Sequence, residues 1–315
     1  MSAMWETMQR QPEDLARLLH DGAVATEAAE RLVGRRIFLV GTGTSWHAAN
    51  IGAFWLFLAG VDARAVQASD AALYGPCPMP SDALVLISHR GTKSYTSQVL
   101  QRARDEGVPT VAIGAIDAPG VDLPTVQAES SSAFTGSYLG ALLRLAQLAA
   151  ALGASLGPLG DVPGTVQSVL QGPSPAVTPP RRLLEFMGAG PNQWTAAEGA
   201  LKVRETAYVA TEGLSYEQLL HGPSVALREG DSLLSLDGGG LASERVAAIA
   251  DAAEANGIAV YRFVERSLGE PLSVFPLTTH VQRIALDMAT ALGTDPDSFG
   301  MDLPGRNETW GTITL

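Results

Sequence analysis

The sequence predicts an α/β fold made of parallel sheets with helices on both faces, and two observations indicate it. Short apolar runs typical of buried strands alternate with helical patterns along the chain, as in sheets whose strands are joined by crossover helices. Each half of the chain also opens with an apolar strand, a glycine turn and a helix. This repeat, in a chain of 315 residues, indicates about two domains of similar architecture.

The first half contains the clearest strand patterns. Strands are expected at residues 36–40, 62–66, 83–88, 110–113 and, with a weaker pattern, 125–127. Helices are expected at residues 45–59, 94–106 and 138–152. The run ALVLIS at residues 83–88 is the strongest strand pattern, because its apolar residues follow one another without a break.

The second half repeats this rhythm. Strands are expected at residues 183–187, 232–236 and 258–263, and helices at 195–208, 243–256 and 280–292. Residues 153–180 are rich in glycine and proline and separate the two halves. We therefore expect a first domain over residues 1–155, a linker over 156–180, and a second domain over 181–315 that ends in an extended tail.

Composition excludes several classes of function. The chain carries 33 acidic and 21 basic side chains, a formal net charge of −12, and has no run of basic residues, so nucleic acid and anionic membranes are poor partners. Cys77 is its single cysteine, and its five histidines lack metal-ligand spacing, so neither a disulfide nor a metal is expected. The absence of a signal-peptide pattern and of an apolar run that could span a bilayer favours a cytoplasmic protein.

The turn after the first strand, GTGTS at residues 41–45, is a candidate anion site. Glycines let the backbone approach a ligand, and a helix start offers unpaired N–H groups that favour an anion. Gly43, Thr44 and Ser45 are the expected ligands. A tight turn in which Ser45 merely caps the helix explains the pattern about as well. Neither glycine-rich nucleotide motif is matched, so a nucleotide is not implied.

A second candidate loop follows the strongest strand and precedes a helix. Its residues are Ser88, His89, Arg90, Gly91, Thr92, Lys93 and Ser94. Cations at a helix start oppose the helix dipole by ~0.3–1 kcal/mol each. A bound anion would offset that cost, which favours anion binding over the alternative of a solvated helix start. In open parallel sheets this edge is where ligands bind.

Charged residues on the helix after the second glycine turn form a third candidate. Glu198 and Lys202 are spaced i,i+4 and can pair for roughly 0.2–0.5 kcal/mol, which is a sufficient structural explanation. The mid-helix Gly199 is expected to mark close approach of another backbone. Glu205 could act as a proton-transfer base if it is partly buried. His221 precedes Gly-Pro, where an exposed turn is the ordinary interpretation.

Together these motifs resemble the SIS (sugar isomerase) family, above all the isomerase half of glutamine–fructose-6-phosphate aminotransferase and the related deaminases and deglycases. The matching segments are residues 4–12, 43–48, 88–94, 133–135, 197–206 and 221–223. The resemblance implies two tandem SIS domains, each a three-layer αβα sandwich like flavodoxin, preceded by an N-terminal helix.

The resemblance also implies roles for the candidate residues. Residues 43–45 and 88–94 would hold a sugar phosphate, with Ser130 and Glu198 as further sugar-binding residues. Glu205 would move a proton between C1 and C2, and Lys202 would lie near the developing charge. His221 would help to open the sugar ring from the partner subunit, so a homodimer is implied. No cofactor is needed.

Departures from the family pattern narrow the expected reaction. The loop at 88–94 has His89 for Gln, Arg90 for Ser and Lys93 for Thr, and Trp310 stands where the aminotransferase has a Schiff-base lysine. The chain also lacks the glutaminase domain, so glutamine is not expected as nitrogen donor. We therefore expect a deaminase or a fructosamine-phosphate deglycase. The alternatives are a glutamine-independent aminotransferase and a sugar-phosphate-binding regulator without catalysis.

Overall fold

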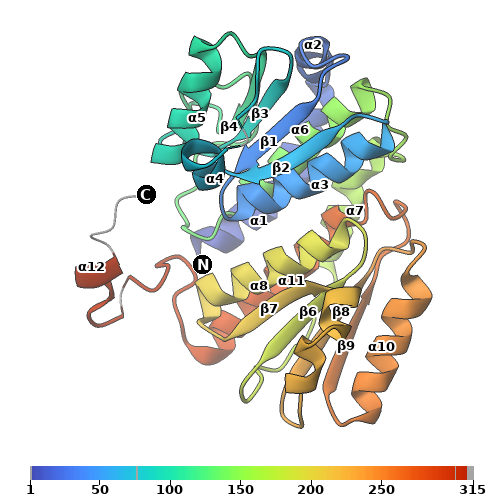
Figure 1. Ribbon diagram of the computed structural model, residues 1–315. Coiled ribbons are helices and arrows are strands. Elements are labelled where there is room, and N and C mark those ends of the chain that lie inside the picture. Colours follow the sequence, from blue (N-terminus) through green and yellow to red (C-terminus); the bar gives the residue numbers. More distant parts are fainter. Residues whose placement is uncertain (1, 76, 302, 311–315) are drawn as a thin grey trace. The chain divides into compact units, whose positions relative to one another are not determined.

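The computed structural model describes residues 2–75, 77–301 and 303–310. The described chain separates into two compact units, each built around one sheet (Figure 1). The β1–β5 unit comprises residues 10–129 and 134–160. The β6–β9 unit comprises residues 2–9, 130–133 and the described residues from 161 onward.

The sheet of the β1–β5 unit is parallel, with the strand order β2-β1-β3-β4-β5. Its strands are β1 (Ile37–Gly41), β2 (Ala63–Gln67), β3 (Ala83–Ile87), β4 (Thr110–Gly114) and β5 (Leu123–Pro124). The expected parallel α/β class is therefore confirmed. In this order the chain reverses direction across the sheet between β1 and β3, the point at which open α/β sheets bind ligands.

Helices cover both faces of this sheet. One face packs against α4 (Ala68–Leu73) and α5 (Ser94–Asp105), which share a core with Val40, Leu84 and Leu86. The other face carries α3 (Thr44–Leu58) and α6 (Gly136–Ala151), with α2 (Ala23–Glu30) packed on α6. The central strands have continuous apolar runs in their sequences because both of their faces are buried.

The β6–β9 unit repeats this plan with the strand order β7-β6-β8-β9, again parallel. Its strands are β6 (Leu184–Gly188), β7 (Thr211–Ser215), β8 (Ser232–Asp237) and β9 (Ala259–Val264). One face packs on α8 (Asn192–Ala207) and α11 (Val274–Leu292). The other packs on α9 (Tyr216–Leu220) and α10 (Ser243–Ala255). The start of α1 (Ala3–His20) adds Met4 and Met8 to the core of this unit.

A set of three glycines recurs at the same spacing in the two units. Gly41 and Gly188 end the first strands, and a Cβ there would lie 2.5 Å from the Ser45 oxygen and 2.2 Å from the Asn192 oxygen. Two residues later, Gly43 (φ 54°) and Gly190 (φ 53°) both have positive φ, a backbone conformation that favours glycine. The duplication is therefore present in the backbone of the turn itself.

The third glycine of each set lies in the helix that follows. A Cβ on Gly52 would lie 2.9 Å from the Leu39 side chain, and one on Gly199 would lie 2.8 Å from the Phe186 ring. The expectation that Gly199 marks a close backbone approach is therefore wrong, since the neighbour is an aromatic side chain. The absent Cβ lets α8 lie directly on the middle of β6.

Several elements differ from the sequence-based expectations. Strand β7 was not expected, because Leu214 is its single large apolar residue and only Thr211 is buried. Helix α11 begins at Val274, six residues before its expected start. Residues 156–180 include a 3-10 turn (Leu159–Asp161) and α7 (Val162–Gln171), where Arg283 donates hydrogen bonds to the carbonyl oxygens of Val169 and Gly172.

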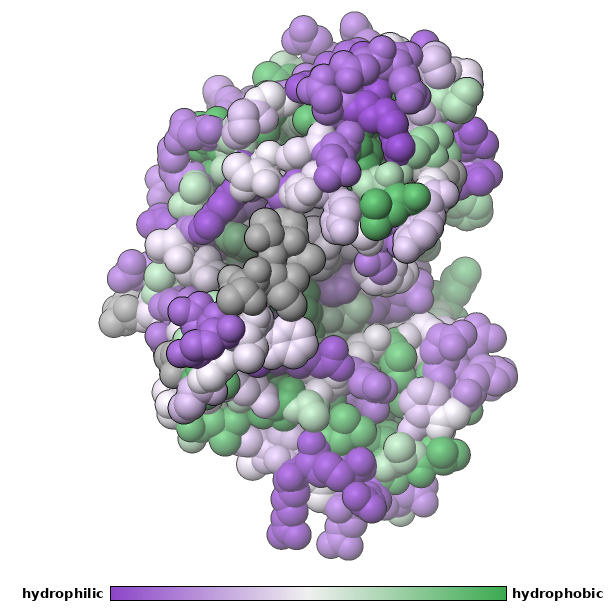
Figure 2. Space-filling view, turned by 60° about the vertical axis from the view of Figure 1, so that its left-hand side comes forward, coloured by the Kyte–Doolittle hydropathy of each residue, from purple (hydrophilic) through white to green (hydrophobic). Residues whose placement is uncertain are grey.

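The expected tail contains the short helix α12 (Arg306–Thr309). Residues 311–315 lie outside the described residues. Every helix in the described ranges is too short or too polar to cross a bilayer. On the face drawn in Figure 2, hydrophilic side chains are interspersed with smaller apolar areas.

Candidate functional site

The turn between β1 and α3 leads into the start of a helix, where the Ser45 N–H donates to the Thr42 carbonyl oxygen at 3.1 Å and the Trp46 N–H donates to the Gly43 carbonyl oxygen at 2.9 Å. Gly43 is the N-cap of α3, and no side chain caps it. The alternative in which Ser45 serves only as the helix cap is therefore wrong, since Ser45 lies inside the first turn. Thr42 and Gly43 are exposed, while Thr44 and Ser45 are half-buried. The geometry fits an anion placed at the helix start.

The loop at residues 88–94 lies beside this turn, because β1 and β3 are adjacent parallel strands. It connects β3 to α5, and α5 also begins without a side-chain cap, at Lys93. Gly91 has φ +66° and a Cβ there would lie 3.3 Å from Pro119, so the loop bends where only glycine fits readily. The two expected anion loops thus follow the carboxyl ends of the adjacent strands β1 and β3, where the chain reverses direction across the sheet.

The first half of this loop is turned toward the protein. Glu129 donates its backbone N–H to Nε2 of His89 at 3.1 Å, and Arg90 donates to the Glu129 carbonyl oxygen at 3.2 Å. The Phe134 ring lies 5.0 Å from the His89 ring and 5.8 Å from the Arg90 guanidinium. Burial, together with Arg90, lowers the pKa of His89 against the opposing effect of Glu129.

The second half of the loop faces solvent. Thr92, Lys93 and Ser94 are exposed. The Ser94 hydroxyl accepts a hydrogen bond from Gln98 at 2.9 Å, and Thr96 donates to the Lys93 carbonyl oxygen at 2.9 Å. Both cations expected to meet an anion, Arg90 and Lys93, are thus exposed, and Arg90 also contacts Glu129 and Phe134.

In the β6–β9 unit, α8 buries three charged side chains together. Lys202 lies between Glu198, with its Nζ 3.5 Å from Oε1, and Glu205, with which it also forms a close ion pair. The side chains of Glu198 and Lys202 are 0% and 1% exposed, while that of Glu205 is 13% exposed. The i,i+4 pair expected from the spacing is present, and Glu205 is the member that reaches the surface.

Two further expected residues lie elsewhere. His221 is the C-cap of α9 and is exposed, and its side chain makes no hydrogen bond or ion pair with Glu198, Lys202 or Glu205 in the described chain. Ser130 is exposed and belongs to the β6–β9 unit. The expected site residues therefore fall into two groups, one in each unit.

Sequence reasoning missed Glu129. Its buried carboxylate accepts hydrogen bonds from the Thr135 N–H and hydroxyl and from the Ser137 N–H, at 2.7–3.2 Å, so it stabilises the start of α6. No local pattern reveals this role, because Glu129 lies six residues before Thr135, outside the usual capping spacing.

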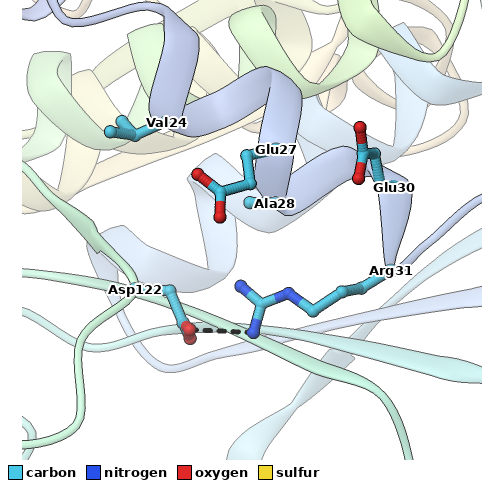
Figure 3. Close-up of a pocket in the computed structure, with 6 residues that line it drawn as sticks. All are labelled: Val24, Glu27, Ala28, Glu30, Arg31 and Asp122. Carbon is cyan, nitrogen blue, oxygen red and sulfur yellow. Dashed lines mark hydrogen bonds and ion pairs between the residues drawn. The ribbon is translucent and has the colours of Figure 1, made fainter.

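A surface groove of about 560 Å³ lies elsewhere on the β1–β5 unit. It is lined by α2, where Arg31 pairs with Asp122 at 2.9 Å beneath Glu27 and Glu30 (Figure 3). Asp122 directly precedes β5 and Arg31 precedes β1, so the groove lies toward the amino ends of the strands. Ligands in open α/β sheets bind at the opposite edge.

The sheet order defines an open α/β protein, a class whose members bind ligands at the carboxyl ends of their strands. Residues 33–118 match the family model of the SIS domain, so the resemblance to that family is confirmed.

Comparison with known proteins gives relatives of this class. Glutamine–fructose-6-phosphate aminotransferase [isomerizing] of Acidithiobacillus ferridurans is 28% identical over 327 residues, which cover 90% of this chain and 53% of that protein. The chain spans about half the length, or less, of the curated relatives it matches.

Solved structures share the fold. Tagatose-6-phosphate ketose/aldose isomerase of Escherichia coli has a TM-score of 0.83 at 19% identity and covers 95% of both chains. Glucosamine-6-phosphate deaminase of Thermotoga maritima has a TM-score of 0.79 at 19% identity, covering 94% of this chain and 97% of that one.

Proposed function

We propose that the chain is a sugar-phosphate isomerase that acts on an amino sugar 6-phosphate, as a deaminase or a fructosamine-phosphate deglycase. The observation that carries the proposal is the carboxylate of Glu205, which reaches the surface while the buried Lys202 holds it by an ion pair. A carboxylate fixed in this way is suited to proton transfer. The names of the relatives and of the structural neighbours support the substrate class.

The proposed reaction moves two protons. In an open-chain 2-amino aldose phosphate, Glu205 takes the proton from C2, and the electron pair moves through C1 onto the carbonyl oxygen. Glu205 returns its proton to C1 as the nitrogen lone pair forms the C2=N bond, and a proton passes from this nitrogen to O1. The resulting ketose imine is hydrolysed by water to the ketose phosphate and ammonia. Lys202 orients the Glu205 carboxylate and supplies positive charge near the enediol-like intermediate.

We propose separately that the β1–β5 unit holds an anion site for a phosphate group. The Gly43 backbone and the hydroxyls of Thr44 and Ser45 would contribute to it from the start of α3, and Ser88 to Ser94 would supply the second anion loop. An exposed cation, Lys93, adds positive charge there. Ser130 and Glu198 remain proposed sugar-binding residues.

Three further parts of the proposal concern organisation. Residues 181–315 would be a second SIS domain, in tandem with a first domain over 1–155 and joined by 156–180. The protein would be a cytoplasmic homodimer. The ring-opening group would be the partner subunit's His221, which agrees with the exposure of this side chain in a single chain.

Proton NMR in D₂O tests the proposal with a panel of hexose, hexosamine and fructosamine 6-phosphates. We expect loss of the C1 or C2 proton signal of one sugar, and loss of that exchange in Glu205→Gln. Glu217→Gln changes an exposed carboxylate of the same unit and is the matched control. If Glu205→Gln exchanged the proton as fast as the wild type, the proposed role of Glu205 would be wrong.

A glutamine-independent aminotransferase is the second candidate, because the names of the curated relatives include an aminotransferase activity. It would convert a ketose phosphate to an amino sugar only when ammonia is present. A regulator without catalysis would instead show ligand-induced stabilisation with no proton exchange. Measuring exchange with and without ammonium separates these outcomes.

A further inference from the structure

The loop at residues 88–94 is fixed at one end and exposed at the other. The Ser88 N–H donates to the Ile113 carbonyl oxygen at 2.9 Å, and the Ala115 N–H donates to the His89 carbonyl oxygen at 2.8 Å. These bonds extend the pairing of β3 with β4 by two residues. Beyond Gly91, the side chains of Thr92, Lys93 and Ser94 face solvent.

His89 joins this loop to a second segment. Its Nε2 accepts the hydrogen bond from the Glu129 N–H, while Glu129 itself holds the start of α6 through three further hydrogen bonds. Arg90 adds a bond to the Glu129 carbonyl oxygen, and Phe134 packs against both side chains. The 88–90 segment is therefore held to Glu129 and Phe134 largely by the His89 ring and the Arg90 side chain.

The contact with Glu129 requires neutral His89. Nε2 can accept the N–H only without a hydrogen of its own, so the single ring proton lies on Nδ1. Within the described residues, Nδ1 is buried and has no hydrogen-bond partner. Protonation of Nε2 would bring two N–H donors face to face. Burial disfavours the charged ring, and of the two charged groups that act on it, Glu129 raises the His89 pKa and Arg90 lowers it.

We propose that neutral His89 is a positioning residue that anchors the anion loop to Glu129, so that the exposed cations of the loop, and not the His89 ring, present positive charge to the phosphate. This rests on the proposed function in one respect, namely that the loop binds a phosphate group. The hydrogen bond to Glu129 assigns His89 to holding the loop, while Arg90, Thr92, Lys93 and Ser94 are exposed.

The pH dependence of sulfate binding tests the anchor, because the charge of sulfate does not change near neutral pH. If His89 bound the anion directly, its protonation would strengthen binding. If it anchors the loop, protonation breaks the bond to Glu129 and weakens binding. We expect titration calorimetry to show that sulfate binding by the wild type weakens progressively as the pH falls below 6.5, the ordinary pKa of histidine, because the pKa of His89 is lowered.

Variants of His89 and Lys93 provide the controls. His89→Gln keeps a hydrogen-bond acceptor near the Nε2 position but does not titrate. This variant should bind sulfate within about threefold of the wild type and lose the pH dependence. His89→Leu lacks the acceptor and should bind sulfate roughly tenfold more weakly than the wild type. Lys93→Gln should weaken binding at every pH with the pH dependence retained. The comparison of sulfate binding by the wild type and by His89→Gln does not depend on a variant that is expected to be less stable.

A second measurement determines the protonation state of His89 without any ligand. Selective ¹⁵N labelling of the five histidines, with His89 assigned from its loss in His89→Gln, should show a neutral ring protonated at Nδ1 at pH 7. A ring that titrates normally, with sulfate binding that tightens on acidification, would overturn the inference. Failure of the proposed function differs: no sugar would exchange a proton, yet sulfate binding would keep the predicted pattern.

Discussion

Glu185 and Glu212 occupy paired positions on the adjacent strands β6 and β7. Glu185 is 1% exposed, and its Oε2 has no hydrogen-bond partner among the described residues. Burial raises the pKa of Glu185 to about 7, with Glu212 adding to the rise and Arg204 opposing it. A carboxyl group with this environment is protonated in the folded protein at pH values where it is ionised in the unfolded chain.

We therefore predict that folding stability falls as the pH rises. The proton on Glu185 favours the folded state fully below the unfolded pKa near 4.5, and this contribution is lost as the pH rises through about 7. The loss by pH 8 is on the order of 3 kcal/mol. Urea unfolding of wild type and Glu185→Gln at pH 5 and pH 8 measures it.

Two variants define the outcome of this experiment. Glu185→Gln should unfold at nearly the same urea concentration at both pH values, because its amide does not titrate. Glu212→Gln should reduce the pH dependence without abolishing it, because burial remains the larger cause. Equal pH dependence in wild type and Glu185→Gln would show that another group is responsible.

Lys202 is predicted to be essential for folding as well as for activity. Lys202→Met leaves Glu198, which is fully buried, without its cation, and breaking a buried pair in this way costs about 3–5 kcal/mol. The double variant Lys202→Met with Glu198→Gln removes the uncompensated charge and should recover much of the stability. Thermal unfolding compares the variants. If Lys202→Met alone is as stable as wild type, Glu198 and Lys202 do not form an ion pair in solution.

The recurring helical glycines give a third prediction. Alanine at Gly199 would place its Cβ 2.8 Å from Phe186 and 3.1 Å from Val281, an overpacking cost of about 1–3 kcal/mol. The higher helix propensity of alanine offsets at most about 1 kcal/mol of this cost, so Gly199→Ala should lower the free energy of unfolding. Gly52→Ala should behave alike, since its Cβ would lie 2.9 Å from Leu39.

Gly164 supplies the matched control, because it also lies in a helix and a Cβ there would meet nothing within 4 Å. Gly164→Ala should therefore stabilise the protein by about 0.5–1 kcal/mol. The three variants can be compared by urea unfolding. A stabilising Gly199→Ala would mean that Phe186 and Val281 move aside at little cost.

The fold was predictable because its central strands are buried on both faces. The apolar runs of β1, β3 and β6 are fully buried, and each was expected from its pattern to within one residue. Strand β7 escaped prediction because Gly213 lies against Ala196, where a Cβ would come within 2.3 Å of the carbonyl oxygen. That constraint belongs to the packing of α8 on β7 and leaves no periodic pattern.

The candidate site was predictable where it depends on local spacing. The pair of Glu198 and Lys202 follows from their separation on a helix. The inward direction of His89 does not, because its partner Glu129 is 40 residues away in sequence. Sequence patterns placed His89, Arg90 and Lys93 in one loop, and only the tertiary contacts separate their environments.

Lysine chemistry tests both groups of site residues at once, because lysine occurs only at positions 93 and 202. Lys93 is exposed and Lys202 is 1% exposed, so reductive methylation of the folded protein should modify Lys93 and spare Lys202, as read by mass spectrometry of peptides. Sulfate should slow the modification of Lys93 relative to chloride at equal ionic strength, because the anion would pair with the ammonium group. Equal labelling of both lysines would contradict the buried cluster on α8, and a Lys93 rate unaffected by sulfate would contradict its assignment to the anion loop.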